Sequence, residues 1–136
     1  MLWHGTIFAH VSTRNGFIRL GHSVLELSDR DILKNNKSLG DLNGSKKLNF
    51  KIIDICNNFR PNLIVLGHAD LVKVNTLSEI KKNQPDIKIA QWFLDPLNKN
   101  GPDFDKNKKR ITDKLDFIDA SFLTTSPDML KFINNK

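Results

Sequence analysis

Hydrophobic positions along the chain follow two kinds of pattern. Short apolar runs bounded by turn residues, as at 63–67, are typical of buried strands, whereas apolar residues at helical spacing indicate amphipathic helices. The segment 45–59 is the clearest helix, because its apolar positions share one face: Leu48, Ile52, Ile55, Cys56 and Phe59. The pattern therefore predicts strands that alternate with helices.

Five strands are expected, at 1–4, 22–28, 63–67, from Ile87 to the break at Pro96, and at 120–124. Helices are expected at 12–20, 45–59, from 75 or 76 to just before Pro85, at 106–117 and from Pro127, after a capping Ser126. Loops should cover 6–11, 29–44 (with a helical turn at 31–33) and 97–105. This order predicts an α/β fold, a doubly wound parallel five-stranded sheet in a three-layer, Rossmann-like (flavodoxin-like) single domain over 1–136.

The strand from Ile87 shapes the functional expectation. Its apolar run lacks a clean polar alternation, which favours a strand covered on both faces. Pro96 ends the strand and holds Asp95 in an extended conformation. Asp95 should therefore lie at the carboxyl edge of the sheet, where open α/β sheets bind ligands.

Charge and composition exclude only a few classes of protein. The net charge of +6 is compatible with an anionic partner, but the basic residues are spread over expected helix faces without interleaved aromatics, so solubility is favoured over specific nucleic-acid binding. The single cysteine, Cys56, excludes a disulfide framework and leads us to expect a cytoplasmic protein. No apolar run reaches the roughly 18 residues of a membrane span.

Several familiar chemistries lack their motifs. No G-x-G-x-x-G or Walker A sequence is present, the His and Cys residues have no metal-ligand spacing, and we expect neither a metal nor a cofactor. A phospho-accepting receiver domain would need acidic residues after the first strand, where this chain has His4 and Gly5. A cobalamin-binding loop, Asp-x-His-x-x-Gly, is also missing; a cofactor binder of that type would reveal itself by a coloured ligand.

Polar residues at the ends of the strands are the candidate site. They are Gly5, Thr6, Ser12, Thr13 and Arg14 after the first strand, His68 and Asp70 after the third, and Trp92 and Asp95 after the fourth. A helix start with hydroxyls and an arginine suits an anion or a sugar hydroxyl, a histidine beside a carboxylate suits a general base, and an aromatic beside a carboxylate suits a carbohydrate. The alternatives are an ordinary helix cap, a solvated corner, and a core tryptophan followed by a turn.

Some of these segments resemble the N-terminal domain of CgeB-like (spore-maturation type) GT-B glycosyltransferases. The resemblance lies in His4-Gly5-Thr6, Ser12-Thr13-Arg14, Leu20-Gly21-His22-Ser23-Val24, Arg60-Pro61-Asn62-Leu63 and Trp92-Phe93-Leu94-Asp95. It implies the acceptor-binding half of a two-domain glycosyltransferase, with His68 or His10 as catalytic base. The nucleotide-sugar donor would bind a C-terminal domain that is absent here.

Two functions therefore stand as hypotheses. The first is an acceptor-binding glycosyltransferase half, inactive alone, whose partners are a sugar or glycan acceptor and the missing domain or a partner chain. The second is a non-catalytic flavodoxin-like binding or interaction domain. A stable homodimer that buries the carboxyl edge of the sheet would favour this second hypothesis. The sequence does not define the sugar, the acceptor or the linkage.

Overall fold

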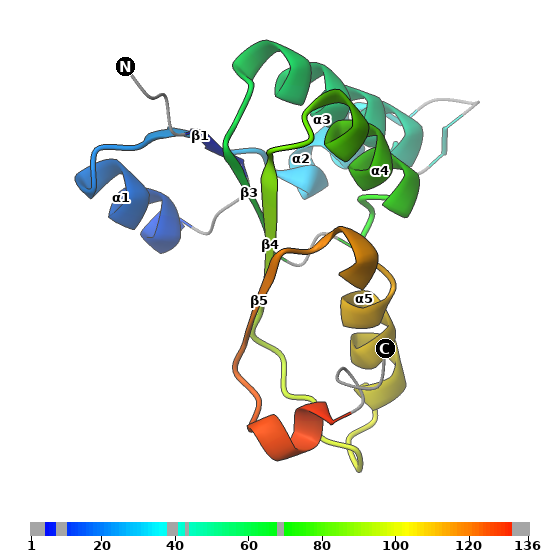
Figure 1. Cartoon of the computed structure of the whole chain (residues 1–136). Helices are drawn as coiled ribbons and strands as arrows, with labels where there is room; N and C mark the ends of the chain where they lie inside the picture. Colours follow the sequence, from blue (N-terminus) through cyan, green and yellow to red (C-terminus); the bar gives the residue numbers. More distant parts are fainter. Residues whose placement is uncertain (1–4, 8–10, 38–40, 43, 68–69, 132–136) are drawn as a thin grey trace.

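A parallel sheet forms the centre of the molecule, with the strand order β2-β1-β3-β4-β5 (Figure 1). The computed structural model describes residues 5–7, 11–37, 41–42, 44–67 and 70–131. The strands are β1 (Gly5–Ile7), β2 (Ser23–Leu25), β3 (Leu63–Gly67), β4 (Lys88–Phe93) and β5 (Ala120–Leu123). The predicted α/β class with a parallel sheet is confirmed.

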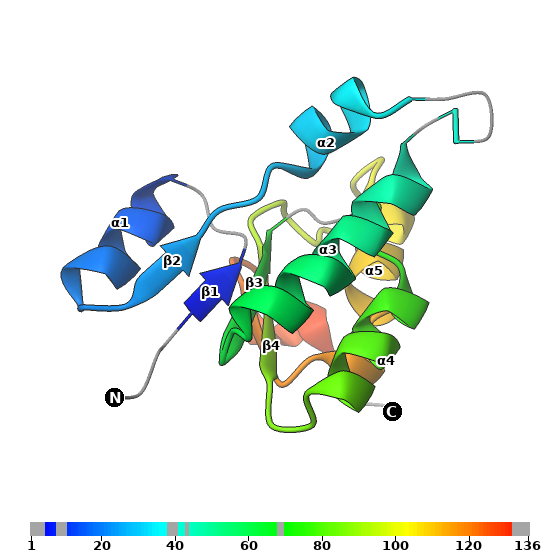
Figure 2. The same ribbon diagram turned by 90° about the horizontal axis from the view of Figure 1, so that it is seen from above.

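The helices lie unevenly on the two faces of this sheet. They are α1 (Val11–Arg19), α2 (Asp29–Asn35), α3 (Ser45–Phe59), α4 (Val74–Asn83) and α5 (Phe104–Thr112), with short 3-10 turns η1 (Leu115–Phe117) and η2 (Pro127–Leu130). Figure 1 shows α3, α4 and α5 together on one side of the sheet and α1 on the other, and Figure 2 gives the same separation from above.

The main core lies between the sheet and the helices α3 and α4. Its buried members are Ile32, Leu48, Ile52, Cys56, Ile64, Leu66, Val72, Leu77, Ile80, Ile87 and Ile89. A smaller cluster, of Phe93, Leu97 and Ile111 with Leu123 and Leu130 against it, lies beneath α5. The apolar face predicted for 45–59 is thus the face that α3 buries.

Two helix ends explain where the chain turns back into the sheet. Gly21 follows α1 with a positive φ of 85°, and the amides of Gly21 and His22 donate to the carbonyls of Ile18 and Phe17. This pair of hydrogen bonds forms a Schellman motif, after which the chain enters β2 directly. Arg60 ends α3 with φ 49°, so a non-glycine residue adopts the left-handed conformation just before Pro61 and β3.

Several predicted boundaries are wrong. The predicted strand 1–4 lies outside the described residues, but the loop predicted from residue 6 is wrong at its start, because Thr6 and Ile7 belong to β1 and pair with β2 and β3. Asp29–Asn35 is a full helix rather than one turn, since Ser28 Oγ accepts the Asp31 amide at 3.3 Å and Ile32 is buried. The predicted helix 106–117 begins at Phe104, ends at Thr112 and is followed by η1.

The last predicted helix is only the 3-10 turn η2. Pro127 does occupy its first turn, but the Ser126 side chain makes no capping hydrogen bond. Leu130 packs against the cluster beneath α5. The described chain after β5 therefore returns to the side of the sheet that α3, α4 and α5 already cover.

The expectation that the fourth strand is covered on both faces is also wrong. Ile89, Gln91 and Phe93 are buried on one face of β4. On the other face Ala90 is buried as well, but Lys88 and Trp92 at either end of it are exposed. Trp92 is 39% exposed. The face of β4 that points away from α4 and α5 is open at its carboxyl end.

Candidate functional site

Two of the predicted strand-end carboxylates converge on one arginine. Arg110, near the end of α5, places Nη2 2.6 Å from Asp70 Oδ2 and Nη1 3.9 Å from Asp95 Oδ2. Nη1 also donates to Asn107 Oδ1 at 3.2 Å, and Asn107 is buried. The guanidinium is therefore held in place from three directions at the carboxyl edge of β3 and β4.

Lys114 lies beside this arrangement and is itself buried. Desolvation lowers the pKa of the Lys114 ammonium, while the carboxylates of Asp70 and Asp113 act in the opposite direction. The sequence interpretation of the run from Lys106 to Arg110 as a solvated helix face is wrong at Arg110, whose side chain is only 25% exposed. No local pattern could have shown this, because Arg110 and Asp70 are distant in the chain.

A hollow opens between the loop after β3, the start of α4, and α5. Its volume is about 370 Å³. The lining residues are Asp70, Val72, Lys73, Val74, Lys106, Lys109, Arg110, Asp113 and Lys114. A much smaller cavity of about 20 Å³ lies next to it, and Asp70, Trp92, Arg110 and Lys114 contribute to its wall. The structure thus brings together Asp70 and Asp95 of the predicted set and adds two basic residues that sequence reasoning missed, Arg110 and Lys114. Trp92 contributes to the wall of the small cavity, but its ring packs against Phe122 on the other face of the sheet.

The rest of the predicted set lies elsewhere or outside the described residues. The candidate bases His10 and His68 lie outside the described residues. Gly5 and Thr6 belong to β1, and Ser12, Thr13 and Arg14 belong to α1. Arg14 Nη1 donates to Glu26 Oε2 at 3.0 Å, so this arginine is engaged just beyond β2. The role predicted for these residues in one shared site stays a prediction.

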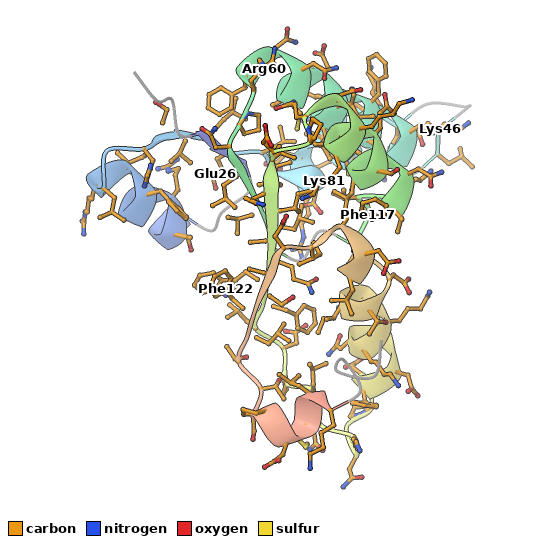
Figure 3. The ribbon with its side chains drawn as sticks, viewed as in Figure 1. Glu26, Lys46, Arg60, Lys81, Phe117 and Phe122 are labelled. Carbon is orange, nitrogen blue, oxygen red and sulfur yellow. The ribbon has the colours of Figure 1, made fainter. Side chains whose placement is uncertain are left out.

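The second feature of the molecule is an aromatic pair on the open face of the sheet. Trp92 and Phe122 are directly opposite each other in the β4–β5 register, with ring centroids 6.1 Å apart. Phe122 is 55% exposed, and Figure 3 shows it on the side of the sheet away from α5. Leu94, two residues beyond Trp92, is exposed as well. We call Trp92, Leu94 and Phe122 the aromatic face.

Within the described ranges, no group of three or more His, Cys, Asp or Glu side chains is placed to hold a metal ion. The same part of the chain contains no helix that is long and apolar enough to cross a membrane.

Comparisons with known proteins give a likeness of fold only. No protein-family model matches the chain, and no curated protein does. Among solved structures, the signal receiver domain of a putative LuxO repressor protein from Vibrio parahaemolyticus is 12% identical, with a TM-score of 0.46 over 98% of this chain and 88% of that one. A LuxR-family DNA-binding response regulator from Staphylococcus aureus is 16% identical, with a TM-score of 0.43 over 98% and 97% of the two chains.

These findings overturn the glycosyltransferase interpretation. The similar solved structures are receiver and response-regulator proteins, not GT-B enzymes, and no glycosyltransferase family matches. The expected sugar or glycan acceptor and the missing donor-binding domain are withdrawn as partners for the same reason.

The motifs that suggested a glycosyltransferase have local structural explanations. Leu20-Gly21-His22 is the end of α1, where Gly21 takes the left-handed conformation. Arg60-Pro61 ends α3 and leads into β3. Such helix ends and strand entries recur in any parallel α/β sheet, so they carry little information about function.

Proposed function

We propose that this chain is a non-catalytic, flavodoxin-like interaction domain that binds an acidic amphipathic helix across β4 and β5. The observation that carries the proposal is the Trp92–Phe122 pair, which lies exposed at the carboxyl ends of β4 and β5. Apolar aromatic surface of this kind, arranged together rather than scattered, marks an interaction site more often than a solvated surface.

A helix is the occupant that the sheet favours. Parallel strands are normally covered by helices on both faces, and here α1 is the described helix on the open side (Figure 1). Trp92 and Phe122 lie on adjacent strands, which are about 4.8 Å apart. A single helix, about 10 Å across, would cover both rings with one apolar stripe.

Charge favours an acidic partner. The chain carries a net charge of +6. Lys88 lies on the same face of β4 as Trp92 by strand alternation, and its side chain is 67% exposed although it pairs with Asp119 at 3.5 Å. A helix with Glu or Asp beside its apolar stripe would complement both the rings and this lysine.

Selection from a displayed library of helical peptides tests this function. We expect enriched peptides to carry apolar residues at positions i, i+3 or i+4 and i+7, flanked by acidic residues, and to lose binding to the Phe122→Gln variant. Phe50→Gln is the matched control, because Phe50 is 73% exposed on α3, in the helix layer on the other side of the sheet. Enriched peptides without an apolar stripe, or equal loss with both variants, would contradict the proposal.

Phosphoryl acceptance is the competing function, because a signal receiver domain is among the similar folds. With β1 at Gly5–Ile7, the next residues are Phe8, Ala9 and His10, so no carboxylate follows the first strand. We therefore expect acetyl phosphate with Mg²⁺ to leave the mass of the intact protein unchanged. A stable phosphoryl adduct on an aspartate would replace the proposed function.

A further inference from the structure

The hollow between the β3–α4 loop and α5 is independent of the aromatic face and has a different chemistry. Its charged lining comprises the cations Lys73, Lys106, Lys109, Arg110 and Lys114 and the anions Asp70 and Asp113, so five positive charges face two negative ones. Its volume of about 370 Å³ is within the range of small-molecule pockets.

Both carboxylates of the hollow are already engaged. Asp70 holds Arg110 at 2.6 Å, and Asp113 Oδ2 accepts Lys109 Nζ at 2.6 Å. Across the described residues, no carboxylate lies within ion-pair distance of Lys73 or Lys106. The charge that remains for a ligand is therefore positive.

The start of α4 adds to this field. Lys73 precedes the helix, its side chain makes no capping hydrogen bond, and the first turn contains no acidic residue. The amides that open a helix lack intrahelical acceptors and carry partial positive charge. Val74 brings this end of α4 to the wall of the hollow.

We propose that this hollow binds a phosphate group, either as inorganic phosphate or diphosphate or as part of a small phosphorylated molecule. Lys73 and Lys106 would contact the phosphate oxygens, and the amides of Val74 and Asn75 at the start of α4 would donate to them, since the Thr76 amide already donates to the Lys73 carbonyl. Arg110 would add positive charge at the wall of the hollow while its Nη2 and Nη1 stay paired with Asp70 and Asn107.

Amide chemical shifts in a pyrophosphate titration at constant ionic strength test the site. We expect saturable shifts confined to residues 72–76 and 104–114, with millimolar or tighter affinity. The Lys73→Gln/Lys106→Gln double variant should weaken binding on the order of tenfold, since it removes charged hydrogen-bond donors. The Lys51→Gln/Lys82→Gln variant is the control, because it removes the same charge from exposed positions that do not line the hollow. Its affinity should match that of the parent.

Further results separate the site from bulk charge and identify its source of phosphate. Equal weakening by both double variants, or shifts spread over every basic surface, would overturn the proposal, as would no saturable shift with well-dispersed spectra. Ribose 5-phosphate that binds more tightly than inorganic phosphate would support the site and assign it to phosphorylated small molecules. Equal affinities would support the bare anion. The Phe122→Gln variant should bind pyrophosphate with the affinity of the parent. A failure of the phosphate site would therefore not affect the proposal that β4 and β5 bind an amphipathic helix.

Discussion

Trp92 and Phe122 face each other across adjacent parallel strands, with ring centroids 6.1 Å apart, on the side of the sheet away from the main core. Phe93, the next residue after Trp92, points to the opposite face and is buried beneath α5. Two phenylalanines of the same small region therefore have opposite environments, and this contrast can be measured.

Substitutions at these two phenylalanines should have very different effects on folding. Phe93→Ala should lower the free energy of unfolding by about 3–5 kcal/mol, because it leaves a cavity in the cluster with Leu97 and Ile111. Phe122→Gln should change it by no more than about 0.5 kcal/mol, since the ring is exposed. Urea unfolding measures both values, and a large loss from Phe122→Gln would mean that the aromatic face is part of the core.

Asp119 should make stability depend on acid pH. Desolvation raises the pKa of this carboxyl, but the hydrogen bonds from Lys81 Nζ at 2.6 Å and the Ile89 amide at 2.8 Å, with the charges of Lys81 and Lys88, bring it below the usual value. The unfolded state then binds the proton more readily. This contribution is present above about pH 4 and is lost as the pH falls below it.

The Asp119→Asn variant isolates that contribution. It should be less stable than the parent at neutral pH, and the difference should shrink as the pH is lowered from about 5 to about 2. Unfolding curves across this range test it. A difference that stays constant with pH would show that the carboxylate does not carry the effect.

Cys56 should be unreactive in the folded protein. Burial raises the pKa of its thiol to about 12, and the side chain is inaccessible within the main core. Ellman's reagent at pH 8 should therefore modify the thiol only after unfolding in guanidinium. Modification of the native protein within minutes would mean that α3 opens readily from the sheet.

Asn49 links α3 to the start of α4. Its Oδ1 accepts the Lys73 amide at 2.8 Å and the Thr76 hydroxyl at 2.7 Å, and its Nδ2 donates to the Leu71 carbonyl at 2.9 Å. Asn49→Ala should destabilise the fold by about 1–3 kcal/mol, because buried polar partners lose their bonds.

Asn58 on the same helix provides the control for that substitution. Its Nδ2 donates to the Asp54 carbonyl at 2.9 Å at an exposed position, so Asn58→Ala should cost less than about 0.5 kcal/mol. Thermal or urea unfolding compares the two. Equal losses would argue that Asn49 acts through helix propensity rather than through its contacts with α4.

The elements with strong periodicity could be predicted from the sequence. The bounds expected for the helix 45–59 and the strand 63–67 are those observed, because each has a long apolar pattern with clear breaks. The three-residue β1 has no such pattern, and its pairing with β2 and β3 decides its position. Short strands of this kind depend on tertiary contacts rather than on local sequence.

The candidate site was only partly predictable for a related reason. The strand ends indicate Asp70 and Asp95, which the structure places beside the same arginine, but Arg110 itself lies in a run of basic residues on an expected surface helix. The open face did leave a signal that was overlooked: Lys88 and Trp92 share one side of the strand, and a lysine there indicates solvent.

Fluorescence of Trp92 tests the central claim most directly. A Trp3→Phe background leaves Trp92 as the sole tryptophan. Titration with a designed acidic amphipathic helix should shift its emission to the blue and saturate, whereas a peptide of identical composition without the apolar stripe should not. Adding Phe122→Gln should weaken the saturating response on the order of tenfold, and adding Phe50→Gln should leave it unchanged. An unshifted emission with the striped helix, or an equal response to both peptides, would contradict the account.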